Sequence, residues 1–394
     1  MSEQNSAITG THSHRNLLIL LFAGFVLSGI ATTIIGPMLP IFIRRWSLDD
    51  GQAGLFSTIQ FLFALGGSLA SGAIAAWRGY RPALVLGYAL MGGGLAFLNA
   101  DTHSVALVAT AAFGLGYGLI TPGTNLFVAE LGGAKSASLL NQLNFAWGAG
   151  AMACSPLVAL ALRRNGLGIM LIGTAIFGGI LALGLLFANF GVQAHEKKNA
   201  GTAEPASPSV GLAVTITLAA MFFIYVATEN GIGIWAAEYA KRLASGITSL
   251  TTLAPMFFYA GLTIGRATAP MVLLRLKERK IVLGALSLTA GATALLIGAR
   301  SLPVATVSVF LAGLGCASVY PIFIAWFSRW YGSRAKKIGG ILFALASLGG
   351  SSGPGLIGAV SQFSGSLRVG LLVPLVGAAA LIFLVLSLRR QTAA

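Results

Sequence analysis

Residues 171–188 read LIGTAIFGGILALGLLFA, a run with no charged side chain and a single hydroxyl. Its residues do not alternate between apolar and polar, whereas a transmembrane β-strand runs about ten residues with strict alternation. A backbone that crosses lipid must satisfy its own hydrogen bonds, and a helix that does so needs about 20 apolar residues. The run therefore predicts a transmembrane helix.

Similar apolar stretches lie on both sides of this run, separated by short polar clusters. Twelve of them occupy the chain between residues 16 and 388. The fold class predicted is an all-α integral membrane protein with twelve transmembrane helices. The expected spans are 16–43, 51–76, 82–100, 104–131, 136–162, 167–190, 210–240, 247–274, 280–299, 302–328, 335–362 and 367–388.

Composition supports this prediction. Of the 394 residues, 56% are hydrophobic and 9% are charged, against about 25% charged in a soluble domain. The formal net charge of +15 would also suit a nucleic acid, but its placement favours the positive-inside rule. If the N-terminus is cytoplasmic, sixteen of the 25 Lys and Arg residues lie on the cytoplasmic side, eight lie opposite, and Arg266 is inside a span. We therefore expect a multi-pass cell-membrane protein with both termini cytoplasmic and no nucleic-acid partner.

The chain divides into two similar halves. A polar connection at 191–209 predicts a flexible cytoplasmic linker between six-helix bundles at 16–190 and 210–388, with tails at 1–15 and 389–394. Residues 113–122, FGLGYGLITP, match 312–321, AGLGCASVYP, at an offset of 199, and Pro156 matches Pro354 at 198. Such a near-constant offset indicates a duplicated unit. Parallel repeats predict a substrate site between the halves near the bilayer midplane.

Glu229 is the acid that lies well inside an apolar span. It occurs in the stretch YVATENGIGIW at 225–235, beside Asn230 and close to Trp235, where two glycines weaken the helix. A charge at the bilayer centre costs at least about 2.5 to 3.5 kcal/mol, so it needs a partner, water or a function. We expect Glu229 to bind a hydroxylated ligand, a proton, or both. The alternative is a buried carboxyl that only holds neighbouring helices together.

The other intramembrane charges favour structural roles. Glu130 is near Lys135 at one helix end, and Glu238 is beside Lys241 and Arg242 at another. Arg266 is expected to anchor an inner gate or to pair with a helix C-terminus rather than to bind substrate.

Amide and aromatic side chains form the remaining predicted substrate site. Asn141, Asn144 and Trp147 share one helix face, and amides beside an indole ring are suited to gripping a sugar. Interhelical hydrogen bonding is the alternative for these amides. Weaker candidates of the same kind are Asn125, Tyr259 and Tyr320.

Signs of catalysis are missing from the sequence. It holds no phosphate-binding loop, no nucleophile elbow, and no His or Cys pair at metal-ligand spacing. Cys154 and Cys316 lie inside apolar spans, which makes a disulfide framework improbable. We expect no cofactor, no metal and no enzyme. The expected partners are a small-molecule substrate, with or without protons, and the lipid bilayer, and the protein is expected to be a monomer.

The chain resembles the major facilitator superfamily. The loop GAIAAWRGYR at 72–81 is similar to the family signature, except that Ala76 replaces its Asp. The resemblance implies gating roles for Arg78 and Arg81, alongside Arg266.

Within the superfamily the chain is most similar to the fucose, galactose and glucose proton symporters. The matching pieces are 125–132, 140–148, 225–235 and 261–266. This resemblance implies sugar uptake, and Glu229 matches the Glu that many relatives have in span seven. Two membrane acids of fucose permease fall at Gly36 and Thr121, so their coupling role does not carry over. Either Glu229 takes the proton, the transporter is a uniporter, or the substrate is not a hexose.

These observations predict a secondary active transporter that moves a sugar or a similar small polar metabolite by alternating access. Three alternatives stay open: an uncoupled uniporter, a drug or metabolite exporter, and a membrane-embedded enzyme or lipid-handling protein.

Overall fold

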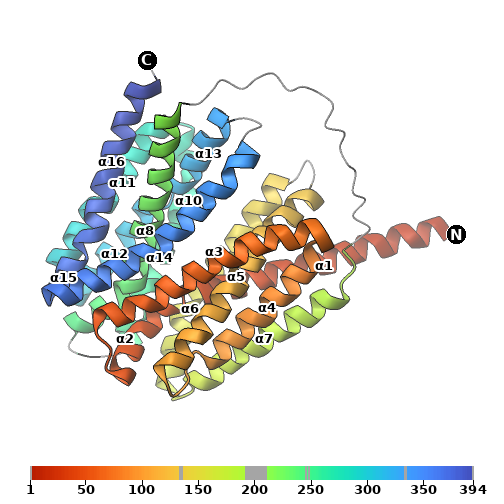
Figure 1. The fold of residues 1–394 in the computed structure, drawn as a ribbon, viewed down its shortest axis with the longest axis horizontal. Helices are drawn as coiled ribbons and strands as arrows, with labels where there is room; N and C mark the ends of the chain where they lie inside the picture. The colour runs from red at the N-terminus through yellow and green to blue at the C-terminus, as the bar shows by residue number, and fades with distance from the viewer. Residues whose placement is uncertain are drawn as a thin grey trace. The chain divides into compact units, whose positions relative to one another are not determined.

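The computed structural model describes residues 2–132, 136–190, 211–244, 246, 249–331 and 335–392. These residues form helices and connections without a strand, so the all-α prediction is confirmed (Figure 1). The predicted linker at 191–209 lies outside the described residues. The first-half helices are α1 (Ser2–Thr33), α2 (Ile35–Trp46), α3 (Asp50–Arg78), α4 (Tyr80–Phe97), α5 (His103–Gly132), α6 (Ser136–Arg163) and α7 (Leu167–Phe187).

The second-half helices begin at residue 212. They are α8 (Leu212–Leu243), α9 (Ser249–Thr252), α10 (Ala254–Leu273), α11 (Glu278–Gly298), α12 (Leu302–Cys316), α13 (Val319–Tyr331), α14 (Ala335–Ser364), α15 (Leu367–Gly370) and α16 (Leu372–Thr392). The helix α1 begins at Ser2 and α16 ends at Thr392, so both helices extend into the segments predicted as tails.

Four helix pairs are each one span broken in two, so sixteen helices make twelve spans in the described part of the chain. Proline has no N–H, and the carbonyl four residues before it therefore loses its helical donor. A proline follows each of the four breaks, and the carbonyl four residues before that proline lies within two residues of the break. Proline alone does not break a helix here, since Pro122 and Pro156 lie inside continuous α5 and α6. The prolines that follow the breaks are Pro37, Pro255, Pro321 and Pro374.

Nine of the twelve spans are long and apolar enough to cross a bilayer by length and composition, counted over the described residues. The other three expected spans are α4, α10 and α14, which carry more Gly, Ser, Thr or charge. Large apolar side chains face outward, including Phe363 at 96% exposure and Phe187 at 83%. Such an apolar surface is expected of a protein solvated by lipid.

Contacts divide the chain into two compact units, each described here by itself. Unit 1 holds Met1–Thr32, Leu62–Leu157 and Ala161–Ala200, and unit 2 holds Thr33–Phe61, Val158–Leu160 and Gly201–Ala394. The division differs from the predicted halves because α2 and the start of α3 group with the second-half helices. A Cβ on Gly36 would lie 3.1 Å from the Gly233 carbonyl oxygen. Thr58 and Ser351 exchange hydrogen bonds, since each hydroxyl donates to the other residue's carbonyl at 2.9 and 3.0 Å.

Glycines allow close helix packing inside each unit, as expected for helices in lipid. In unit 1, a Cβ on Gly116 would lie 2.5 Å from the Gly87 carbonyl oxygen, so α4 and α5 are in backbone contact. In unit 2, a Cβ on Gly313 would lie 2.0 Å from the Phe258 carbonyl oxygen, which joins α10 and α12 in the same way. The helix α8 packs against α14 and α16 in unit 2 (Figure 1).

Candidate functional site

Glu229 lies near the middle of α8 and faces Arg266 of α10, both in unit 2. The Glu229 Oε1 and Arg266 Nη2 atoms are 4.0 Å apart, and the side chains are 15% and 33% exposed. The sequence predicted that Arg266 anchors a gate or pairs with a helix end, and the structure gives it a carboxylate partner that was not named for it. A signal for this pairing existed, because the census of intramembrane charges left one central acid and one base, and such charges pair in lipid.

Aromatic side chains lie one helical turn before Glu229. The Tyr225 hydroxyl donates to the Cys316 carbonyl at 2.8 Å, and Tyr225 is within electrostatic range of both Glu229 and Arg266. The Tyr320 ring lies 5.7 Å from the Tyr225 ring. Tyr320 follows the break between α12 and α13 and is half-buried. The structure thus gathers Glu229, Arg266, Tyr225 and Tyr320 in one region.

Two other predicted ligand residues of unit 2 are packed away. Trp235 is fully buried, and its indole N–H donates to the Pro354 carbonyl at 2.9 Å. Tyr259 is 6% exposed, and a Cβ on Gly233 would lie 3.2 Å from its hydroxyl. In this conformation both side chains pack against other helices instead of lining a ligand site. Their burial follows from tertiary contacts with α14 and α8 that no local pattern reveals.

Asn230 keeps capacity for a ligand. It is half-buried, and its Nδ2 donates to the Val226 carbonyl at 3.0 Å within α8. An amide group has two N–H donors and an oxygen acceptor, so one intrahelical bond leaves the rest of its hydrogen-bonding capacity.

The amide candidates of unit 1 lie on α5 and α6. Asn125 is half-buried and donates to the Thr121 carbonyl at 2.8 Å, and Asn144 is exposed and donates to the Leu140 carbonyl at 2.8 Å. Asn141 is exposed and Trp147 is half-buried on α6. Asn125 and Asn144 each use one N–H inside their own helix, which leaves the amide oxygen for another partner.

The predicted gating arginines lie where α3 ends and α4 begins, in unit 1. Arg81 donates from Nη2 to the Ala188 carbonyl at 2.8 Å, after the end of α7. The Arg78 guanidinium lies 4.1 Å from the centre of the Trp77 ring. The Tyr80 hydroxyl donates to Glu130 at 2.6 Å, a partner that the sequence did not predict for this carboxylate. Lys135, its predicted neighbour, lies outside the described residues.

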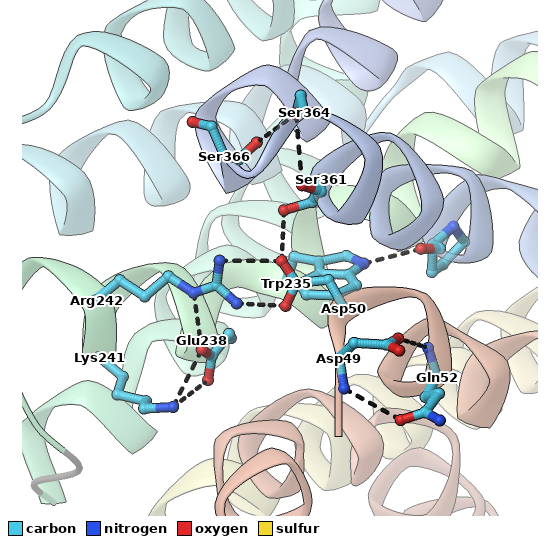
Figure 2. Close-up of polar contacts among 11 residues, drawn as sticks. Asp49, Asp50, Gln52, Trp235, Glu238, Lys241, Arg242, Ser361, Ser364 and Ser366 are labelled. Atoms are coloured by element: carbon cyan, nitrogen blue, oxygen red, sulfur yellow. Dashed lines mark hydrogen bonds and ion pairs between the residues drawn. The ribbon is translucent and has the colours of Figure 1, made fainter. Parts of the chain in front are cut away.

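A second cluster of charged side chains lies at the C-terminal end of α8 (Figure 2). Glu238 is 2% exposed and pairs with Lys241 at 3.1 Å and Arg242 at 2.8 Å, which confirms the predicted neighbours. The Arg242 guanidinium also pairs with Asp50 at the start of α3, and the Ser361 hydroxyl of α14 donates to the same carboxylate (Figure 2). Nearly every polar atom of this cluster has a partner, so its role is to hold three helices of unit 2 together.

Within the described part of the chain, no group of three His, Cys, Asp or Glu side chains could hold a metal ion. The charged and amide groups above can recognise hydroxyls and exchange a proton, and no nucleophile with a neighbouring base stands among them.

The chain matches a family model and many solved structures. The family model described as Major Facilitator Superfamily matches residues 21–302. No curated protein matches the chain. Solved structures match it over nearly its whole length at low identity, which establishes likeness of fold.

Three of these structures are transporters with different names. A bacterial homolog to the human lysosomal transporter Spinster is 13% identical over 96% of this chain and 97% of its own, with a TM-score of 0.78. The nucleoside transporter NupG is 15% identical over 97% and 99%, with a TM-score of 0.72. The E. coli fucose:proton symporter FucP is 16% identical over 94% and 98%, with a TM-score of 0.61.

Proposed function

The chain belongs to the major facilitator superfamily, and on that premise we propose that it moves a sugar or a similar small polar metabolite by alternating access, coupled to protons through Glu229. The family makes the chain a multi-pass membrane transporter and not an enzyme. The observation that carries the finer proposal is the loose pair of Glu229 and Arg266 in the middle of α8 and α10.

The wide separation of the Glu229 and Arg266 side chains supports the binding of a polar ligand by this pair. At 4.0 Å the two groups balance each other's charge without a direct hydrogen bond between them. A carboxylate accepts about four hydrogen bonds and a guanidinium donates five, so both retain capacity. Sugar hydroxyls can donate to Glu229 and accept from Arg266, while an apolar sugar face stacks on Tyr320.

Protonation of Glu229 supplies the coupling step. The neutral acid no longer attracts Arg266, so the proton changes how α8 and α10 are held and which charge meets the ligand. At the two positions where fucose permease has membrane acids, this chain has Gly36 and Thr121, which cannot take up a proton. A Cβ on Gly36 would lie 3.1 Å from the Gly233 carbonyl oxygen, so a carboxylate side chain there would need the Gly233 backbone to shift.

The amides of unit 1 complete the proposal. We assign ligand contacts to Asn125, Asn141, Asn144 and Trp147 together with Asn230, and we assign gating to Arg78 and Arg81. Both termini are cytoplasmic in this proposal, as the distribution of Lys and Arg implies. The name of FucP, a sugar:proton symporter, and that of NupG, a nucleoside transporter, both point to polar cargo that contains a sugar ring.

Uptake into proteoliposomes tests the proposal. Purified protein is reconstituted, and labelled hexoses and nucleosides are offered with and without an inward proton gradient. We expect uptake that the gradient stimulates. Uptake that ignores the gradient would identify a uniporter and remove Glu229 from coupling. Transport of apolar drugs in place of every polar compound would favour the exporter.

A further inference from the structure

A cavity of about 430 Å³ opens at one end of unit 2, away from Glu229. It lies where α11 begins, α13 ends and α16 approaches its last turns. Its lining combines two cations, Lys277 and Arg279, with two indole rings, Trp326 and Trp330, and with apolar side chains of α16. We call it the α11–α13–α16 cavity.

The acid in this cavity is already neutralised. Glu278 accepts hydrogen bonds from Arg329 Nη1 at 2.9 Å and from the Trp326 indole N–H at 2.7 Å. Arg329 Nη2 contacts the same carboxylate. The negative charge of Glu278 is therefore balanced by Arg329, and it does not also balance Lys277 and Arg279.

Lys277 and Arg279 lack an acidic partner among the residues that the structure describes. Arg279 instead donates from Nη2 to the carbonyls of Val385 and Leu386 at 3.1 and 3.2 Å, which fixes its guanidinium at the cavity without cancelling its charge. Lys277 is exposed. The cavity thus presents two uncompensated positive charges.

Apolar and aromatic surface surrounds these charges. The Trp326 and Trp330 rings stack with centroids 6.0 Å apart, and Val385 and Leu388 line the α16 side. Leu274, immediately before the cavity in sequence, is 88% exposed. Tryptophans and cations at the ends of membrane helices mark the depth of lipid headgroups. The occupant must therefore carry negative charge at one end and hydrocarbon at the other.

We propose that the α11–α13–α16 cavity binds an anionic phospholipid, with its phosphate at Lys277 and Arg279 and its acyl chains along α16 and Leu274. Basic pockets between helices at a membrane surface are known to suit such headgroups. This site is separate from the proposed transport site, so the lipid proposal does not depend on which substrate the protein moves.

Native mass spectrometry of the purified full-length protein tests the site. Dioleoyl phosphatidylglycerol is titrated against dioleoyl phosphatidylcholine, which has the same chains and no net charge. We expect phosphatidylglycerol to bind more tightly, and we expect Lys277→Gln with Arg279→Gln to weaken it by about fivefold for each cation removed. The matched control is Arg163→Gln with Arg164→Gln, which removes the same charge from exposed positions elsewhere and should leave this binding unchanged.

Two further variants protect the test against unfolding. Lys277→Gln alone removes an exposed cation and should cost about fivefold, and Arg279→Lys keeps the charge and should retain preference for the anionic lipid. Equal binding of the two lipids, or binding unchanged in the double variant, would overturn the proposal. Displacement of phosphatidylglycerol by millimolar inorganic phosphate would assign the site to free phosphate and overturn the lipid.

Discussion

Glu229 and Glu238 are two carboxylates of the same helix, α8, with opposite surroundings. Glu238 is 2% exposed and is held by Lys241 at 3.1 Å and Arg242 at 2.8 Å. Glu229 is 15% exposed and has Arg266 at 4.0 Å. An acid inside a membrane helix therefore need not be a functional group. What separates the two is whether neighbouring groups already fill the carboxylate's hydrogen-bonding capacity.

The difference has a local cause. Lys241 and Arg242 follow Glu238 by three and four residues, which places all three on one face of α8. No Lys or Arg lies within one turn of Glu229 on α8, so its cationic partner comes from another helix, α10. A partner supplied by a second helix can move when that helix moves.

Replacing Glu229 should have the largest effect on function. An inward gradient of about one pH unit can drive about tenfold accumulation through one coupled proton. We expect Glu229→Gln to lose this accumulation entirely and to retain exchange of labelled for unlabelled substrate, because the amide still accepts hydrogen bonds but takes up no proton. Proteoliposome uptake measures both. The control is Glu130→Gln, and accumulation at the normal level in Glu229→Gln would show that the proton passes elsewhere.

Replacing Arg242 should have the largest effect on stability. Arg242→Gln leaves Glu238 with Lys241 alone and Asp50 without its cation, and we expect a loss of about 2 kcal/mol, below the value for a fully buried pair because Arg242 is 35% exposed. Thermal unfolding in detergent measures the change, and exchange activity should survive in the folded fraction. The Asp50→Asn and Arg242→Gln double-mutant cycle isolates the pair. Simple additivity of the two changes would mean that this pair contributes nothing of its own.

The same comparison extends to neutral polar groups, beginning with Asn144. This exposed amide has unused hydrogen-bonding capacity, so its role should lie in ligand contact. We expect Asn144→Ala to weaken substrate affinity by about fivefold, the effect of roughly one hydrogen bond, with an unchanged unfolding temperature. Equilibrium binding and uptake kinetics measure it. Wild-type affinity would exclude Asn144 from the site.

Replacing Trp235 should change stability and leave substrate affinity unchanged, and its effect should be the smallest of the four. Its indole N–H is already used by the Pro354 carbonyl at 2.9 Å. Trp235→Phe should lower stability by about 1 kcal/mol by removing the indole hydrogen bond to that carbonyl, and substrate affinity should stay as it was. A selective loss of affinity at normal stability would return Trp235 to the ligand site.

Much of this protein was predictable from local pattern. The apolar runs predicted the twelve helical spans, and the comparisons confirm the superfamily that the short motifs resembled. Spacing along α8 also gave Glu238 its correct partners. These features depend on residues a few positions apart, whose geometry a helix fixes by itself.

Contacts between distant residues were not predictable in this way. Asp50 meets Arg242 across a separation of 192 positions, and Trp235 meets Pro354 across 119. Each depends on which helices pack together and at what rotation, and in lipid that choice comes from close fitting of small residues rather than from hydrophobicity.

The sequence by itself determined that the chain is a helical membrane protein and that Glu229 is the acid well inside an apolar span. Tertiary structure alone decided that Trp235 and Tyr259 are packed away and that α2 joins the second-half helices in unit 2. The physical reason is that helix formation and membrane insertion are set by the composition of each segment. Partner choice depends on surfaces that exist only once the helices have packed.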